Sequence, residues 1–310
     1  MSDERARYRA VEEEAFAAYE RGDLDGGVAL LRAAMPELPG WRSDLAHFAA
    51  CLLALRDRPA EALAELHTAY QAGGWWHRRI LLDDGDLAGL RGLPGFADLV
   101  EGAHARAEAA DPATRPPVVR RPAGPPRGLL LALHGAGEDA HDAAEAWGAA
   151  VDAGHLLVTI DSTQLNTPMY RSWPDPSVGL RDIAAALETL TPDELRLPRV
   201  AAGFSAGGRQ ALLWALAGTP HAPSRFVAVA PAVHSAQLGG LAAAVERGLT
   251  GVVVVGDRDD DVRDGALAAV RDLRAAGLPC RLDEVPGLGH AFPPDFDRRL
   301  PALLADGPRV

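Results

Sequence analysis

The chain has 310 residues, 48% of them hydrophobic, so it can bury a sizeable core and is long enough for two domains. Its net charge of −12 is spread over short acidic and basic runs, which argues against a nucleic-acid partner, and no apolar run is long enough to span a membrane. All 31 basic residues are arginine, and the lack of lysine excludes a Schiff base to pyridoxal phosphate and a phosphate-binding-loop lysine. We expect a cytoplasmic enzyme.

Residues 1–110 have the pattern of a small all-α domain. Two stretches, 15–40 and 48–74, align at an offset of 35. The offset pairs small or apolar residues: Ala15 with Ala50, Gly27 with Ala62, and Leu31 with Leu66. Small residues let two antiparallel helices approach closely, and the turns are predicted at Gly22-Asp23 and Asp57-Arg58.

These two units resemble tetratricopeptide repeats, including Pro39 at the position where such a repeat often ends. The resemblance implies helical hairpins that stack on one another, with the stretch 81–108 supplying the remaining helices as a cap. For this domain two alternatives stay open. It is a groove that binds a peptide partner, or it is a spacer or self-association element.

The two cysteines are predicted to be inert. Cys51 lies in an apolar helical stretch and Cys280 begins a strand-like one, so we expect two buried free thiols. No CxxC or HExxH motif occurs, and nothing in the spacing indicates a structural or catalytic zinc. We therefore expect no metal.

A proline-rich linker is predicted at residues 111–127. Proline favours extended backbone and cannot donate to a β-ladder, so this stretch is expected to contribute at most one edge strand near Val118-Val119. The domain boundary is placed here, and residues 128–310 form the predicted catalytic domain.

The catalytic domain alternates short apolar runs with amphipathic helical segments. The predicted strands are 129–135, 155–161, 199–205, 225–233, 251–257 and 280–287. Near-continuous apolar strands separated by helices indicate an α/β fold with a mostly parallel sheet covered on both faces. Chemistry in such sheets collects at the carboxyl ends of the strands.

One serine lies at such a strand end. Gly203, Ser205 and Gly207 spell G-x-S-x-G between the strand 199–205 and a helical segment. A serine on a tight strand-to-helix turn takes a strained backbone conformation that projects its hydroxyl, and flanking glycines avoid collisions with the strand and the helix. We therefore predict that Ser205 is a nucleophile.

A serine needs a base that a carboxylate orients, and the chain supplies both downstream. Four candidate carboxylates follow the strand 251–257: Asp257, Asp259, Asp260 and Asp261. His290 lies in a glycine-flanked loop after the last strand. Asp257, Asp259 and Asp261 alternate as in a calcium loop, but Val262 stands where an EF-hand needs glycine, so we expect no metal there.

Residues 117–310 resemble a compact member of the α/β-hydrolase superfamily, in the carboxylesterase/phospholipase or dienelactone-hydrolase-like branch. The resemblance rests on "GFSAGG", "HGAGED" (residues 134–139) and "GLGHAFP" (residues 287–293). It implies a Ser205-Asp259-His290 triad, because the family spacing after Gly256 selects Asp259, and an oxyanion hole from the N–H groups of Ala136 and Ala206. The dienelactone enzymes carry cysteine where Ser205 stands.

The loop 162–178 and the strand ends are expected to shape the substrate pocket. The candidates with core packing as the alternative are Met169, Tyr170, Trp173, Phe204 and Phe292, and Gly135 is a further candidate that allows close approach to the backbone. His134 is interpreted as a structural residue that braces the "HGAGED" loop.

The predicted reaction is hydrolysis of a small carboxylic ester or thioester by a carboxylesterase-like serine hydrolase, through an acyl-enzyme and without a cofactor. Two alternatives share the triad, a serine peptidase and an acyltransferase. A third is a non-catalytic binding or scaffold protein that works through its helical repeats.

Overall fold

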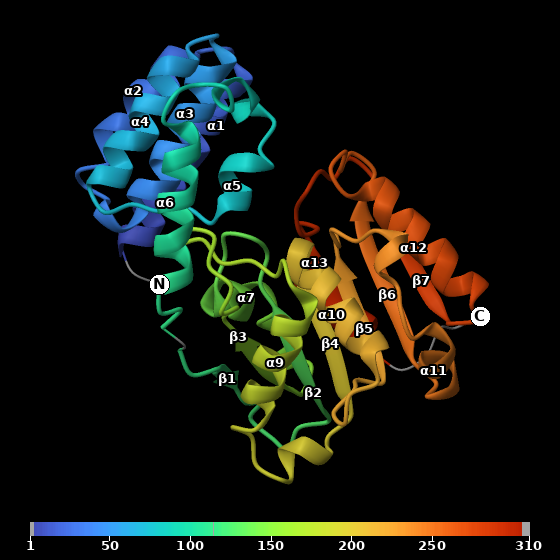
Figure 1. Cartoon of the computed structure of the whole chain (residues 1–310). Coiled ribbons are helices and arrows are strands. Elements are labelled where there is room, and N and C mark those ends of the chain that lie inside the picture. The colour runs from blue at the N-terminus through green and yellow to red at the C-terminus, as the bar shows by residue number, and fades with distance from the viewer. Residues whose placement is uncertain (1–2, 114, 306–310) are drawn as a thin grey trace. The chain divides into compact units, whose positions relative to one another are not determined.

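The computed structural model describes residues 3–113 and 115–305, and they form two compact units (Figure 1). The helical unit contains the described residues up to Pro112 together with the segment Leu165–Tyr170. The α/β unit contains the described residues from Ala113 to Gln164 and from Arg171 onward. The predicted domain limits at residues 1 and 310, and Thr114 of the predicted linker, lie outside the described residues.

The helical unit is built from antiparallel helices, with neighbours along the chain packed against each other from α1 to α4 (Figure 1). Its α-helices are α1 (Asp3–Glu20), α2 (Leu24–Ala34), α3 (Arg42–Leu55), α4 (Pro59–Gln71), α5 (Arg78–Leu82) and α6 (Phe96–Ala109). Two 3-10 turns, η1 (Pro39–Trp41) and η2 (Asp86–Leu90), lie between them. The predicted all-α region is confirmed, and the tetratricopeptide resemblance stays a prediction.

The internal repeat is visible in the backbone. Gly22 and Asp57, which are 35 positions apart, occupy the α1–α2 and α3–α4 turns with φ angles of 74° and 56°. A Cβ at Gly27 would lie 2.8 Å from Leu52 Cδ1, so glycine permits the close helix approach that the alignment predicts. The other paired residues are fully buried: Ala15, Ala50, Ala62, Leu31 and Leu66.

The segment Leu165–Tyr170 is held in the helical unit by polar contacts. Thr167 Oγ1 donates to the buried carboxylate of Asp44, with distances of 2.9 and 3.0 Å to its two oxygens. The backbone N–H of His77 donates to Asn166 O at 2.7 Å, and Arg79 Nε donates to Asn166 Oδ1 at 2.9 Å. A short stretch between two elements of the α/β unit therefore completes the helical unit.

The α/β unit has a seven-stranded sheet in the order β1-β3-β2-β4-β5-β6-β7 (Figure 1). The strands are β1 (Val118–Arg120), β2 (Gly128–Leu133), β3 (His155–Ile160), β4 (Arg199–Phe204), β5 (Arg225–Val229), β6 (Thr250–Gly256) and β7 (Cys280–Val285). All neighbouring pairs are parallel except β1 with β3. The six predicted strands and the predicted edge strand in the linker are confirmed.

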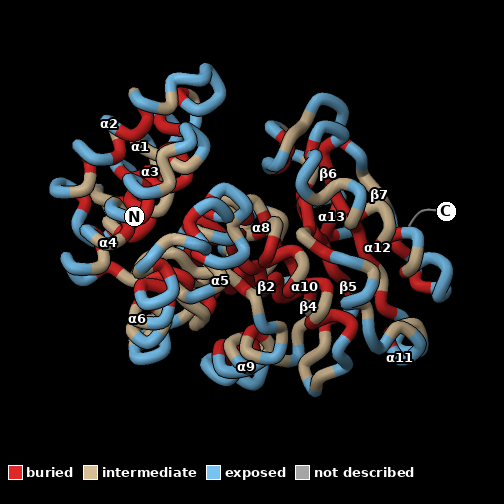
Figure 2. Tube along the Cα trace, turned by 45° about the horizontal axis from the view of Figure 1, so that its top comes forward, coloured by how far each residue is buried: buried red, intermediate tan, exposed pale blue. Residues whose placement is uncertain are grey.

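Helices cover both faces of this sheet, as the apolar strands require. They are α7 (Ala140–Ala146), α8 (Ala149–Asp152), α9 (Pro176–Leu187), α10 (Ser205–Ala217), α11 (Leu241–Glu246), α12 (Arg263–Ala275) and α13 (Phe296–Leu304). Side chains alternate between the faces: Leu129 and Leu131 of β2 belong to the hydrophobic cluster that includes residues of α9, α10 and α12, whereas Leu130 belongs to the cluster that includes residues of α7 and α13. Figure 2 shows the buried strands between more exposed helices.

The helices that follow the strands were predicted only in part. Helices α9, α10 and α12 confirm predicted amphipathic segments, whereas α7, α8, α11 and α13 were not predicted. Two short 3-10 turns, η3 (Glu194–Arg196) and η4 (Ser235–Gln237), complete the connections. No helix in the described part of the chain combines the length and the apolar character that a bilayer-spanning helix needs.

Candidate active site

Ser205 lies at the junction of β4 and α10, on the turn that the sequence predicts. Its φ of 52° is in the left-handed region that side chains other than glycine rarely adopt. A Cβ at Gly203 would lie 2.4 Å from the carbonyl carbon and oxygen of Gly207, and a Cβ at Gly207 would lie 2.3 Å from His134 O. Gly203 therefore lets β4 approach the start of α10, and Gly207 lets the turn pack against the end of β2.

His290 connects the serine to a carboxylate. Its Nε2 lies 2.9 Å from Ser205 Oγ, and its Nδ1 lies 2.9 Å from Asp259 Oδ2. Since the ionised carboxylate is an acceptor only, Nδ1 carries the proton and Nε2 is free to accept the serine hydroxyl proton. Asp259 is 1% exposed, whereas the His290 side chain is 32% exposed. The arrangement places a serine hydroxyl, an imidazole and a buried carboxylate in line.

Asp259 differs from the other aspartates of its loop. Its Oδ1 accepts from the backbone N–H of Val262 at 3.3 Å, which fixes the carboxylate that faces His290. Asp257 is exposed and accepts from Gly287 N at 2.6 Å instead. Asp260 and Asp261 are exposed as well. Of these four described aspartates, the structure therefore brings Asp259 to the histidine.

The two predicted oxyanion-hole donors lie on adjoining turns. Ala206 is in the first turn of α10, and Ala136 is in the loop that follows β2. Within the described part of the chain, neither backbone N–H has a protein acceptor. The neighbouring N–H groups are occupied: Gly135 N donates to Glu138 Oε2 at 2.7 Å, and Gly137 N donates to Arg171 O at 2.8 Å. These bonds hold the loop and leave Ala136 N–H available for a ligand.

His134 braces the same loop, as the sequence predicts. Its Nε2 accepts from the backbone N–H of Ser162 at 3.1 Å, and its Nδ1 lies 2.6 Å from Gly135 O, to which it donates. Burial lowers the pKa of His134 to about 4, so the ring is neutral near pH 7. Trp173 Nε1 donates to His134 O at 2.9 Å.

Three of the predicted substrate residues lie around His290. The Phe204 ring is 5.0 Å from the His290 ring and stacks on Phe292 with centroids 4.7 Å apart. A Cβ at Gly135 would lie 2.9 Å from Phe204 Cδ1, so glycine allows the loop to approach this aromatic side chain. Their substrate-binding role stays a prediction.

The other three predicted substrate residues have different surroundings. Met169 packs on the core of the helical unit, and Tyr170 lines a cavity of that unit. Trp173 belongs to the α/β unit, is fully buried, and fits the alternative of core packing.

Sequence reasoning missed Glu138, whose carboxylate accepts from Gly135 N and orders the loop that follows β2. An acidic residue three positions after a glycine-rich turn is the signal that could have identified it.

The comparisons with known proteins agree with this architecture. A family model described as "Serine aminopeptidase, S33" matches residues 124–255, which is less than half of the chain and includes Ser205 but neither Asp259 nor His290. The crystal structure of an uncharacterized protein from Bacillus cereus is 22% identical, with 94% of this chain and 96% of that chain covered and a TM-score of 0.52. The α/β unit has an α/β-hydrolase fold.

Other solved structures are similar to a smaller share of the chain. The structure of esterase PE8 is 20% identical, with 61% of this chain and 97% of that chain covered and a TM-score of 0.49. The structure of Zea mays acyl-protein thioesterase 2 is 17% identical, with 61% and 96% covered and a TM-score of 0.47. No curated protein sequence matches the chain. The family match supports a serine hydrolase.

Proposed function

We propose that this protein hydrolyses a carboxylic ester or thioester through an acyl-enzyme on Ser205. The observation that carries the proposal is the contact of His290 with Ser205 Oγ through one ring nitrogen and with Asp259 through the other, each at 2.9 Å. A scaffold that had lost catalysis would have no reason to keep both contacts on a serine with a left-handed backbone.

The proposed reaction follows from which atoms can donate or accept protons. His290 Nε2 takes the Ser205 proton as Oγ attacks the carbonyl carbon, and the charged imidazolium is stabilised by Asp259. The developing oxyanion accepts from the N–H groups of Ala136 and Ala206. His290 then protonates the leaving oxygen or sulfur, and a water molecule repeats the sequence on the acyl-enzyme.

The surroundings of the base favour an apolar acyl or aryl group. Phe204 and Phe292 stack on each other beside His290. The Phe292 ring also contacts the rings of Trp147 and Phe296, with centroid distances of 5.9 and 4.9 Å. Such an aromatic group offers a flat apolar contact to a substrate that is bound next to the serine. We expect esters of modest size to be turned over best.

A second candidate function is peptide hydrolysis from an amino terminus. The matching family is described as a serine aminopeptidase, and the same three side chains cleave amides by the same steps. A free α-amino group would need a carboxylate beside the serine, and Glu138 is the carboxylate on the oxyanion loop. This candidate therefore predicts turnover of amino-acid p-nitroanilides that depends on Glu138.

The test is a chain-length series of p-nitrophenyl esters and amino-acid p-nitroanilides, measured for the wild type and for Ser205→Ala. We expect a burst of p-nitrophenol followed by turnover in the wild type, and a loss of at least about 10³-fold in the variant. Ser224→Ala changes an exposed serine of the same unit and serves as the matched control. The proposal is wrong if the wild type turns over neither series and Ser205 does not react with a fluorophosphonate.

A further inference from the structure

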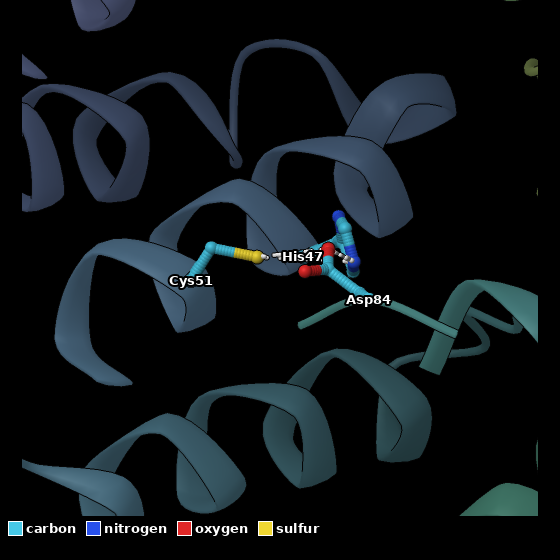
Figure 3. A group of neighbouring side chains, drawn as sticks. All are labelled: His47, Cys51 and Asp84. Atoms are coloured by element: carbon cyan, nitrogen blue, oxygen red, sulfur yellow. Dashed lines mark hydrogen bonds and ion pairs between the residues drawn. The ribbon is translucent and has the colours of Figure 1, made fainter. Parts of the chain in front are cut away.

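Three side chains outside the hydrolase site converge in the helical unit. His47 and Cys51 lie one turn apart on α3, and Asp84 comes from the segment between α5 and η2 (Figure 3). His47 Nε2 lies 3.1 Å from Asp84 Oδ2, Cys51 Sγ lies 3.4 Å from the same oxygen, and Sγ lies 3.9 Å from Nε2. One sulfur, one nitrogen and one oxygen thus face a common point.

The distances are close to the edges of a metal tetrahedron. Zinc bonds of about 2.0 to 2.3 Å to nitrogen, oxygen and sulfur place neighbouring ligand atoms about 3.4 to 3.6 Å apart. The observed separations of 3.1, 3.4 and 3.9 Å bracket that range. A catalytic triad would need Cys51 and Asp84 on different nitrogens of His47, whereas both approach Nε2.

The carboxylate is also oriented as a metal ligand requires. Asp84 Oδ1 accepts from the backbone N–H of Asp86 at 2.9 Å, which turns Oδ2 toward His47 and Cys51. Such outer contacts fix the direction of the ligand and are a regular feature of metal sites. The spacing of His47 and Cys51 places both on one face of α3.

Acidic side chains surround these three residues. They line a cavity of about 660 Å³, and the other carboxylates on its wall are Glu12, Asp44, Asp83 and Asp86. Arg79 is the guanidinium on the same wall. A bound cation favours the thiolate form of Cys51.

We propose that His47, Cys51 and Asp84 bind a divalent cation of the zinc type, with its fourth coordination position open to the cavity. On binding, the Cys51 sulfur forms a bond to the metal and releases its proton to solvent, while His47 binds as the neutral imidazole. Three protein ligands with an open position are typical of zinc that engages a further ligand. That ligand is a small molecule with a thiolate, carboxylate or imidazole donor, sized for the cavity.

This proposal departs from the expectation that the chain binds no metal. The expectation was drawn from the absence of CxxC and HExxH, and the four-residue spacing of His47 and Cys51 is the signal that it overlooked. A second group, His77, His104 and Glu108, also brings potential ligand atoms together in the described part of the chain. It is less suited to a cation, because Glu108 is largely exposed.

Cobalt titration of the metal-free full-length protein tests the site. Co²⁺ bonded to a thiolate gives a charge-transfer band in the near ultraviolet, so the wild type is expected to show this band and saturate with one thiolate-bound ion. Cys51→Ala is expected to abolish the band and weaken binding by more than about 100-fold. Cys280→Ala removes the other buried cysteine, in the α/β unit, and is the matched control.

Several results would overturn the proposal. One is a wild type without a thiolate band at stoichiometric Co²⁺, and another is a band that persists in Cys51→Ala. Loss of cobalt binding in His104→Ala with full binding in Asp84→Asn would assign the ion to the second group instead. Circular dichroism checks that each variant is folded, and the wild-type spectrum tests the site even where a variant is not.

Added imidazole tests the open position. We expect it to shift the visible d–d bands of the cobalt protein, because a fourth ligand enters from the cavity. Unchanged bands at saturating imidazole would show a closed site and would overturn this part of the proposal. Ester turnover by the same samples is expected to depend on Ser205 and not on cobalt, so the two sites fail or succeed separately.

Discussion

Each unit contains a group of three neighbouring side chains: a serine or cysteine, a histidine and an aspartate. The two groups are arranged differently. In the α/β unit, His290 contacts the serine through Nε2 and the aspartate through Nδ1. In the helical unit, Cys51 and Asp84 both approach Nε2 of His47. The first arrangement places the three side chains in a line, whereas the second gathers donor atoms around a point. Which nitrogen is contacted therefore separates the proposed proton transfer from the proposed metal binding.

The two groups also differ in how the backbone presents them. Ser205 is held on a strained turn that requires glycine at positions 203 and 207. His47 and Cys51 need only the regular spacing of α3. Strain at a strand end positions a single reactive atom, while a helix face presents several ligands at low conformational cost.

The largest effect is expected for Asp259→Asn. The amide cannot hold the His290 tautomer that accepts from Ser205, so kcat for the best ester should fall by about 10³- to 10⁴-fold. Steady-state kinetics measure this, and cobalt binding should stay unchanged because the helical site is separate. Asp257→Asn and Asp260→Asn alter exposed residues of the same loop and should leave kcat nearly unchanged. An equal loss in Asp260→Asn would contradict the assignment.

Much of the α/β unit could be predicted from the sequence because its strands are short, nearly continuous apolar runs. The serine turn could be recognised since G-x-S-x-G coincides with a change from strand to helical periodicity. The short helices α7, α8 and α11 gave too little periodicity to be recognised. The C-terminal helix α13 contains Pro301, which argues against a helix in the sequence.

Contacts between residues far apart in the chain could not be predicted from local sequence patterns. Met169 and Tyr170 were expected at a substrate pocket because they lie in a long irregular loop, yet their segment completes the helical unit through Thr167 and Asp44. Likewise, the spacing of His47 and Cys51 on a helix is visible in the sequence. The arrival of Asp84 depends on the turn between α5 and η2, which local patterns do not specify.

The next largest effect concerns the pH dependence of the helical unit. Burial raises the pKa of Asp44 to about 7 from its ordinary value of 3.8, against the lowering effect of the Thr167 hydroxyl. Because the folded pKa exceeds the unfolded one, Asp44 contributes stability below pH 3.8 that is lost as the pH rises toward about 7. The loss is at most about 4 kcal/mol.

Asp44→Asn is therefore expected to flatten the decline in melting temperature across this pH window. Thermal unfolding of the metal-free protein measures this decline in melting temperature. Glu12 and His47 are titratable groups that interact with Asp44. Asp83→Asn, an exposed carboxylate on the same cavity wall, is the control. A wild-type decline that survives in Asp44→Asn would assign it to another group.

The α/β unit is expected to respond to pH in the opposite direction through His134. Its pKa is lowered from 6.5 to about 4, mainly by burial. Stability is therefore present above pH 6.5 and lost as the pH falls toward about 4, by about 3 kcal/mol. His134→Gln should remove this acid sensitivity in the same unfolding experiment, while its amide oxygen can still accept from Ser162. Identical acid profiles for the variant and the wild type would refute the prediction.

The smallest expected effect is a difference in stability between glycine and alanine variants at two positions with strained backbone. Ser205 and Asp57 both have left-handed φ angles, of 52° and 56°. Glycine relieves such strain but loses more conformational entropy on folding, so Ser205→Gly should be more stable than Ser205→Ala by about 1 kcal/mol, and likewise for the two variants at Asp57. Urea unfolding measures both differences.

The two glycine variants should differ in function even where they agree in stability. Asp57→Gly recreates the residue that the first hairpin already has at Gly22, so it should keep both ester turnover and cobalt binding. Ser205→Gly should lose turnover completely, because the strained position also carries the nucleophile. If Ser205→Gly gained no stability over Ser205→Ala, the turn would be relaxed, and its left-handed backbone would be a result of packing around Gly203 and Gly207 alone. A gain with loss of turnover would mean that the α/β unit retains this strain for its chemistry, whereas the helical unit tolerates it in an aspartate that glycine can replace.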